Sequence, residues 1–112
     1  MERVNESDCE FRHGDHGPKY LMRGPHIDWG VIVFKPGQEM GAHAHNQVEE
    51  TFFFLEGTPL MVVDDQQFRV APGDAFRLEP PEAHNIINDT DQDTRLVFIK
   101  TPYLPDDKVD VP

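Results

Sequence analysis

The stretch from Gly37 to Gly57, GQEMGAHAHNQVEETFFFLEG, decides the fold class and the candidate site of this 112-residue chain. It places His43 and His45 two residues apart, with Glu50 five residues later. Side chains at positions i and i+2 of a strand point to the same face, so both imidazoles can reach one ion. His84 follows 34 residues after Glu50. Three imidazoles and one carboxylate, brought together, form a donor set that suits a divalent transition metal.

The spacing resembles the first motif of the cupin superfamily at every defined position: Gly37, five residues, His43-x-His45, four residues, Glu50, six residues and Gly57. Gly73, His84 and Asn88 fit the second cupin motif. Glu79 stands where that motif has a proline, and Pro81 stands where it has a glycine. The segment between the motifs, Thr58 to Pro72, is 15 residues long, which resembles small single-domain microbial cupins.

This resemblance implies an all-β fold, the cupin double-stranded β-helix, which is a small jelly-roll barrel. It also implies that His43, His45, Glu50 and His84 bind one divalent transition metal. A carboxylate among imidazoles favours Fe(II) or Mn(II), and Zn, Ni and Cu remain alternatives. Because proline lacks the conformational freedom of glycine, Pro81 predicts a locally different turn ahead of His84.

The alternation of polar and apolar residues does not identify the carboxylate ligand. Glu50 lies on the same strand face as Phe52 and Phe54. Glu49 lies on the opposite face, together with Thr51, Phe53 and Leu55. Both faces are therefore apolar. The six-residue gap to Gly57 selects Glu50 through the family pattern alone, and Glu49 remains the substitute.

Short β-rich segments separated by turn residues predict a sandwich or barrel. The expected strands are Trp29–Lys35, Thr51–Leu55, Leu60–Val63, Gln67–Val70, Ala75–Leu78, His84–Asn88 and Arg95–Thr101. Residues 1–26 form an N-terminal arm, in which Tyr20–Met22 adds an edge strand and His13 and His16 lie in a flexible, solvated loop. Residues 27–101 form the barrel. The tail, 102–112, packs outside and frays through its last seven residues, since its prolines exclude it from a central strand.

The phenylalanines predict where the interior of the barrel lies. We expect Phe52, Phe53, Phe54, Phe68, Phe76 and Phe98 mostly to fill it. The acid or base of a reaction is not identifiable from sequence. Glu39, Glu49 and Arg77 are candidates only because they lie near the motifs in the chain.

The charge balance argues against two classes of partner. Ten Lys and Arg against 21 Asp and Glu give a formal net charge of −11, which repels nucleic acid and anionic membranes. Cys9 is the single cysteine, so no intrachain disulfide forms, and we expect a cytoplasmic protein. A small barrel with apolar edges is expected to form a C2 homodimer.

Four protein ligands on a six-coordinate metal leave up to two positions open, as in catalytic sites. The sequence therefore favours a small metalloenzyme that oxidises or decarboxylates a small oxygen-bearing ligand. The alternatives are a binding or sensing module that captures a small anion or sugar without turnover, and a zinc-dependent isomerase. The fold does not choose among these reactions.

Overall fold

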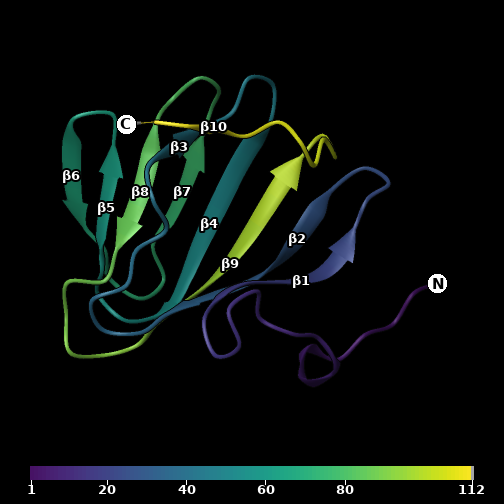
Figure 1. Cartoon of the computed structure of the whole chain (residues 1–112), viewed down its shortest axis with the longest axis horizontal. Coiled ribbons are helices and arrows are strands. Elements are labelled where there is room, and N and C mark those ends of the chain that lie inside the picture. The colour runs from purple at the N-terminus through teal and green to yellow at the C-terminus, as the bar shows by residue number, and fades with distance from the viewer. Residues whose placement is uncertain (112) are drawn as a thin grey trace.

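The computed structural model describes residues 1–111, and Pro112 lies outside the described residues. The described chain contains ten strands and one short 3-10 helix, η1 (Glu6–Asp8). The strands form two five-stranded sheets that face each other (Figure 1). This confirms the predicted all-β fold. Among these residues, no helix has the length and apolar character needed to cross a membrane.

The two sheets are antiparallel throughout. The first has the strand order β1 (Gly17–Arg23), β2 (Asp28–Phe34), β9 (Thr94–Thr101), β4 (Glu49–Glu56) and β7 (Ala75–Leu78). The second has the order β10 (Val109–Asp110), β3 (His43–Ala44), β8 (His84–Ile87), β5 (Leu60–Val63) and β6 (Gln66–Arg69). The seven expected barrel strands all occur, and β1 extends the expected edge strand in both directions.

The core lies between the inner faces of the two sheets. Strand β4 shows how alternation builds it, because Phe52 and Phe54 are fully buried while Phe53 is 43% exposed. Each such burial removes a large aromatic surface from water. The rest of the buried cluster comes from both sheets: Ile32, Phe34, Met61, Val70, Leu78, Ile86, Leu96 and Phe98.

Two of the phenylalanines expected in the interior lie outside it. Phe53 points away from the core on β4, and Phe68 is exposed on β6. The prediction was wrong for these two because aromatic residues suit either face of a strand. On the outer face of the first sheet, Leu55 on β4 and Ile99 on β9 are also exposed, and Ile99 lies opposite Thr51.

The N-terminal arm packs against the first sheet. Glu6 forms an ion pair with Arg95 on β9 and a second with Lys19 on β1. The ammonium of Lys19 also lies 4.3 Å from the centre of the Phe11 ring. These contacts fix the start of the tight turn at 11–16, where His13 donates its backbone N–H to the carbonyl of His16. Residues 12–15 of this turn are exposed, as expected for a solvated loop, and its expected flexibility stays a prediction.

The turn before β8 forms without the family's glycine. Glu82 donates its backbone N–H to the carbonyl of Glu79 at 2.8 Å, and the Glu82 carboxylate accepts the N–H of Glu79 at 2.7 Å. The Pro80–Pro81 peptide bond is cis.

Beyond the strand, Asn88 is fully buried and donates hydrogen bonds to the carbonyls of Phe34 and Gln92. Asn88 thus fixes the turn after β8.

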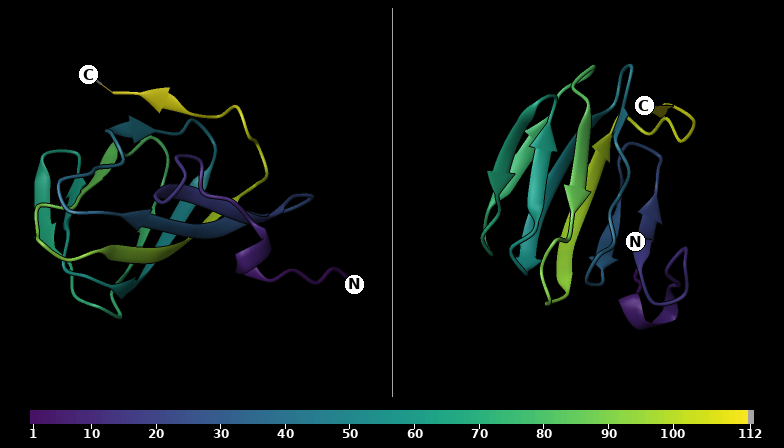
Figure 2. Two further views of the ribbon diagram at one scale, coloured as in Figure 1. Left: turned by 60° about the horizontal axis from the view of Figure 1, so that its bottom comes forward. Right: turned by 60° about the vertical axis from the view of Figure 1, so that its left-hand side comes forward.

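The C-terminal tail is more ordered than its composition predicted. Strand β10 pairs with β3, and the tail runs along the rim of the barrel (Figure 2). The Asp107 carboxylate accepts backbone N–H groups of Asn46, Gln47 and Val48, in the loop that leads from β3 to β4. The expectation that the tail frays from Asp106 onward was therefore wrong for residues up to 111. Asp107 supplies hydrogen-bond acceptors that could not be predicted from the pattern of apolar residues.

Candidate metal centre

The four motif side chains converge at one point between the two sheets. His43 lies on β3 and pairs with His84 on the neighbouring strand β8. His45 follows β3 directly, and Glu50 reaches in from β4 of the opposite sheet. All four residues are buried, and their candidate ligand atoms lie within 4.8 Å of one another.

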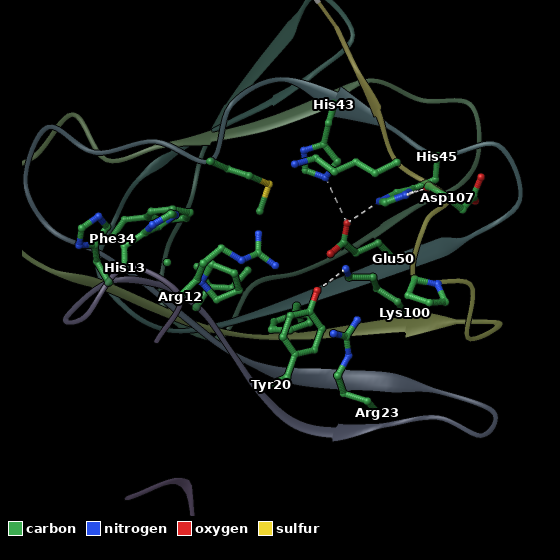
Figure 3. Close-up of a pocket in the computed structure, with 18 of the residues that line it drawn as sticks. Arg12, His13, Tyr20, Arg23, Phe34, His43, His45, Glu50, Lys100 and Asp107 are labelled. Atoms are coloured by element: carbon green, nitrogen blue, oxygen red, sulfur yellow. Dashed lines mark hydrogen bonds and ion pairs between the residues drawn. The ribbon is translucent and has the colours of Figure 1, made fainter. Parts of the chain in front are cut away.

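Glu50 is the centre of this group. Its Oε1 lies 3.1 Å from Nε2 of His45, 3.1 Å from Nε2 of His84 and 3.6 Å from Nε2 of His43. Figure 3 shows the Glu50 carboxylate directed toward the imidazoles. By contrast, Glu49 points away and lies 3.8 Å from Arg77 on the outer side of the first sheet. The geometry thus favours Glu50 as the carboxylate of the group.

The other ring nitrogen of each histidine faces a backbone carbonyl. Nδ1 of His43 lies 3.1 Å from the oxygen of Gly41, and Nδ1 of His84 lies 3.2 Å from that of Glu82. Nδ1 of His45 lies 2.5 Å from the carbonyl oxygen of Asp107. A carbonyl oxygen can only accept, so each Nδ1 carries the proton. In the neutral imidazoles, the Nε2 lone pairs are then directed at Glu50.

This arrangement fits a divalent cation. Three neutral Nε2 atoms and a carboxylate oxygen are all acceptors, and acceptors in a buried site repel one another unless protons or a cation lie between them. Carbonyls that hold the outer nitrogen are typical of histidines that bind metals. The four residues could therefore hold one metal ion, whose identity the donor set leaves open.

Two groups of the cluster, Glu50 and His45, have shifted pKa values. Burial alone would raise the pKa of Glu50, but the imidazoles of His43, His45 and His84 around its carboxylate hold this pKa well below its ordinary value. Burial lowers the pKa of His45, yet hydrogen bonds to Glu50 and to the carbonyl of Asp107 raise it overall. Any metal that binds here must compete with a proton for His45.

A cavity of about 710 Å³ opens next to the group. That volume is in the range of pockets that bind small organic molecules. His43, His45 and Glu50 lie at one side of the cavity, and the aromatic rings of Tyr20, Phe34 and Phe98 form another part of its wall. The site is thus buried but accessible to a ligand from this cavity.

Of the three acid or base candidates, only Glu39 lines this cavity. Its carboxylate accepts a hydrogen bond from the Asn85 amide. Glu49 and Arg77 pair with each other outside the cavity. Their nearness to the motifs in the sequence was therefore a poor guide to their position. Sequence reasoning missed Arg12, Tyr20 and Lys100, which all line the cavity. Lys100 shares strand parity with the buried Leu96 and Phe98, a signal that could have placed it inside.

Two curated relatives match part of the chain. The uncharacterized protein MJ1618 of Methanocaldococcus jannaschii is 36% identical over 68 residues, which cover 61% of this chain and 54% of that protein. Polyketide synthase CurC of Streptomyces cyaneus is 25% identical over 76 residues, which cover 68% of this chain and 49% of that protein. The chain therefore spans about half the length of each of these relatives.

Solved structures match over the whole chain. A Klebsiella pneumoniae protein with a double-stranded beta-helix domain superposes with a TM-score of 0.85 at 17% identity, covering 100% of this chain and 99% of that one. The polyketide cyclase RemF of Streptomyces resistomycificus gives a TM-score of 0.84 at 19% identity, covering 100% and 86%. At such identities the likeness shows the fold alone. It confirms the double-stranded β-helix.

The sequence itself matches a family at the level of the whole barrel. The Cupin domain family matches residues 30–100, which include both motifs and all four residues of the candidate metal centre. The chain therefore belongs to the cupin family.

Proposed function

We propose that this cupin is a metal-dependent enzyme that oxidises or decarboxylates a small organic ligand bound to the metal through oxygen atoms. One observation carries the proposal: His43, His45, Glu50 and His84 form a buried donor set that opens onto a ligand-sized cavity. Structural metal sites are closed, whereas catalytic sites keep positions for substrate. We assign the four residues as ligands, with Fe(II) or Mn(II) favoured over Zn, Ni and Cu.

The protein's own residues have three tasks in this reaction. The carbonyls of Gly41, Glu82 and Asp107 fix the imidazole tautomers so that the Nε2 atoms face the metal position. The aromatic wall excludes water from one side of the ligand. A bound metal supplies Lewis acidity toward the ligand oxygens and, if it is redox-active, electron transfer.

Metal analysis followed by a substrate screen tests the proposal. The purified protein should carry close to one divalent metal per chain. The screen compares small organic acids, diols and diketones under aerobic and anaerobic conditions. Two similar proteins are named as polyketide enzymes, so polyketide-type diketones belong in the screen. Turnover that disappears in His84→Ala supports an enzyme. Tight ligand binding without turnover for any metal would instead indicate a binding module.

A homodimer in the cytoplasm belongs to the same proposal. Phe53, Leu55 and Ile99 are all exposed on the outer face of the sheet that contains β4 and β9. Exposed apolar side chains of this kind favour association, and C2 symmetry is the commonest closed arrangement. A monomeric mass at micromolar concentration in light scattering would contradict the dimer. The acidic balance and the single cysteine support a reducing compartment without nucleic-acid partners.

A further inference from the structure

The cavity wall carries more positive charge than the rest of this acidic protein. The chain has a formal net charge of −11. Yet the charged residues that line the cavity include four cations, Arg12, Arg23, Lys100 and Lys108, against four acids, Glu39, Glu50, Asp106 and Asp107. Which of these charges are free to meet a ligand depends on their partners within the protein.

Several of these charges are already engaged. Arg23 donates two hydrogen bonds, both at 3.2 Å, to the buried carboxylate of Asp28. Lys108 lies 3.8 Å from Asp110. The Asp107 carboxylate is occupied by three backbone N–H groups. Glu39 accepts a hydrogen bond from Asn85. Arg23 and Lys108 are therefore paired with carboxylates, whereas the carboxylates of Glu39, Asp106 and Asp107 keep their negative charge.

Arg12 and Lys100 remain. Within the described residues, neither forms an ion pair with a carboxylate. Nζ of Lys100 donates a hydrogen bond to the neutral hydroxyl of Tyr20 at 2.9 Å and lies 5.5 Å from the centre of the Phe98 ring. In Figure 3 the side chains of Arg12 and Lys100 both point into the cavity. They approach it from different directions, one from the turn at 11–16 and the other from β9.

Lys100 lies beside the metal centre. It is the direct cross-strand neighbour of Glu50, and both side chains face the interior of the barrel. Without a metal, the Glu50 carboxylate offsets the charge of Lys100. With a divalent cation in place, Glu50 neutralises only part of the ion's charge. Beside Glu50, the metal and Lys100 would together carry more positive charge than this one carboxylate offsets, so an anionic group of a ligand would be stabilised there.

We propose that the cavity takes a ligand with two distinct groups: oxygen atoms that chelate the metal, and a carboxylate that Lys100 and Arg12 bind. Tyr20 and Phe98 form the wall against which the carbon skeleton of the ligand packs. Their rings lie edge to face, with their centres 5.0 Å apart. Tyr20 also holds the Lys100 ammonium in position. The inference rests on the proposed metal-dependent function and adds the substrate class to it.

A matched pair of probes separates the two groups of the ligand. Protocatechuate carries a chelating catechol and a carboxylate, and its primary amide replaces the carboxylate by a neutral group of the same shape. Both are titrated calorimetrically into protein loaded with one equivalent of Zn(II), which supports no redox turnover. We expect protocatechuate to bind about tenfold more tightly than the amide, as charge-assisted hydrogen bonds imply.

Substitutions identify the residues responsible. Lys100→Met and Arg12→Gln should each remove most of the preference for the carboxylate while leaving the affinity for the amide nearly unchanged. Lys35→Gln is the matched control, because Lys35 pairs with Asp93 and does not line the cavity. It should keep the full preference. Arg12 is exposed, so its variant remains informative even if Lys100→Met fails to fold.

Each outcome has a defined meaning. Equal binding of both probes to the wild-type protein, or a preference that survives in both variants, would overturn the carboxylate site and leave the metal-dependent function standing. If neither probe binds protein that carries the metal, the proposed chelation fails, and the inference fails with it. A preference that is lost in the Lys100 and Arg12 variants but kept in Lys35→Gln supports the inference.

Discussion

Replacing Asp107 with alanine should weaken metal binding, although its side chain is not among the four donors. The backbone carbonyl of Asp107 accepts the Nδ1–H of His45 at 2.5 Å. Its carboxylate holds the tail that carries this carbonyl by accepting three backbone N–H groups, at 3.1, 2.8 and 2.9 Å. Asp107→Ala removes all three contacts. The carbonyl then loses its fixed position, and the ring of His45 loses its orientation.

The size of the effect follows from the number of histidines affected. Loss of an outer partner of a metal ligand typically reduces metal affinity by about 10–100-fold. His43 and His84 keep their own carbonyl partners, so we expect the lower end, about tenfold. Asp107→Asn should lose less, because an amide keeps one of the two accepting oxygens.

The assay is competition with a chromogenic chelator, with circular dichroism as the check of folding. Asp106→Ala is the control, because Asp106 is the exposed neighbour of Asp107 in the same tail. This substitution removes the same charge. It should bind metal like the wild-type protein. If Asp107→Ala binds within about twofold of the wild type, the tail does not position His45. An equal loss in Asp106→Ala would show that charge alone is responsible.

Three further predictions concern the donors themselves. Glu50→Gln should weaken metal binding in the same competition assay, whereas Glu49→Gln should not, because Glu49 lies outside with Arg77; a larger effect at Glu49 would refute the assignment. His84→Ala should lose most metal in elemental analysis yet keep its β-sheet spectrum, since the apolar cluster holds the barrel; loss of that spectrum would give His84 a structural role. Metal affinity should fall with decreasing pH as His45 gains a proton, and this fall should begin above the ordinary histidine range because the pKa of His45 is raised; affinity that is constant over a pH series would contradict it.

The sequence predicted which four side chains meet, but the alternation of polar and apolar residues could not distinguish Glu50 from Glu49. Both faces of β4 are apolar, so alternation gave no answer, and the family spacing alone selected Glu50. The structure supplies the physical reason for this ambiguity. Phe53 and Leu55 lie on an exposed outer face, so hydrophobicity on that side of β4 does not mark the core.

The residues that complete the site were harder to predict because they depend on long-range pairing. Lys100 lies next to Glu50 only because β9 pairs with β4 in one register, which no local pattern specifies. Asp107 reaches His45 across 62 positions of the chain, from a proline-containing tail without periodicity. Local propensity describes the strands well. It does not describe which strand ends and tails meet at the rim.

The charges around Glu50 connect metal binding to ligand binding. In the metal-free protein, three imidazoles and the nearby Lys100 stabilise the Glu50 carboxylate and lower its pKa. A bound metal would be held by the neutral imidazoles and would take up the charge of Glu50, so Lys100 would lose its compensation and attract an anion. Binding of the metal and of a carboxylate ligand should therefore be cooperative. Thermodynamic linkage requires the coupling to be reciprocal, so the ligand must tighten metal binding by the same factor by which the metal tightens ligand binding.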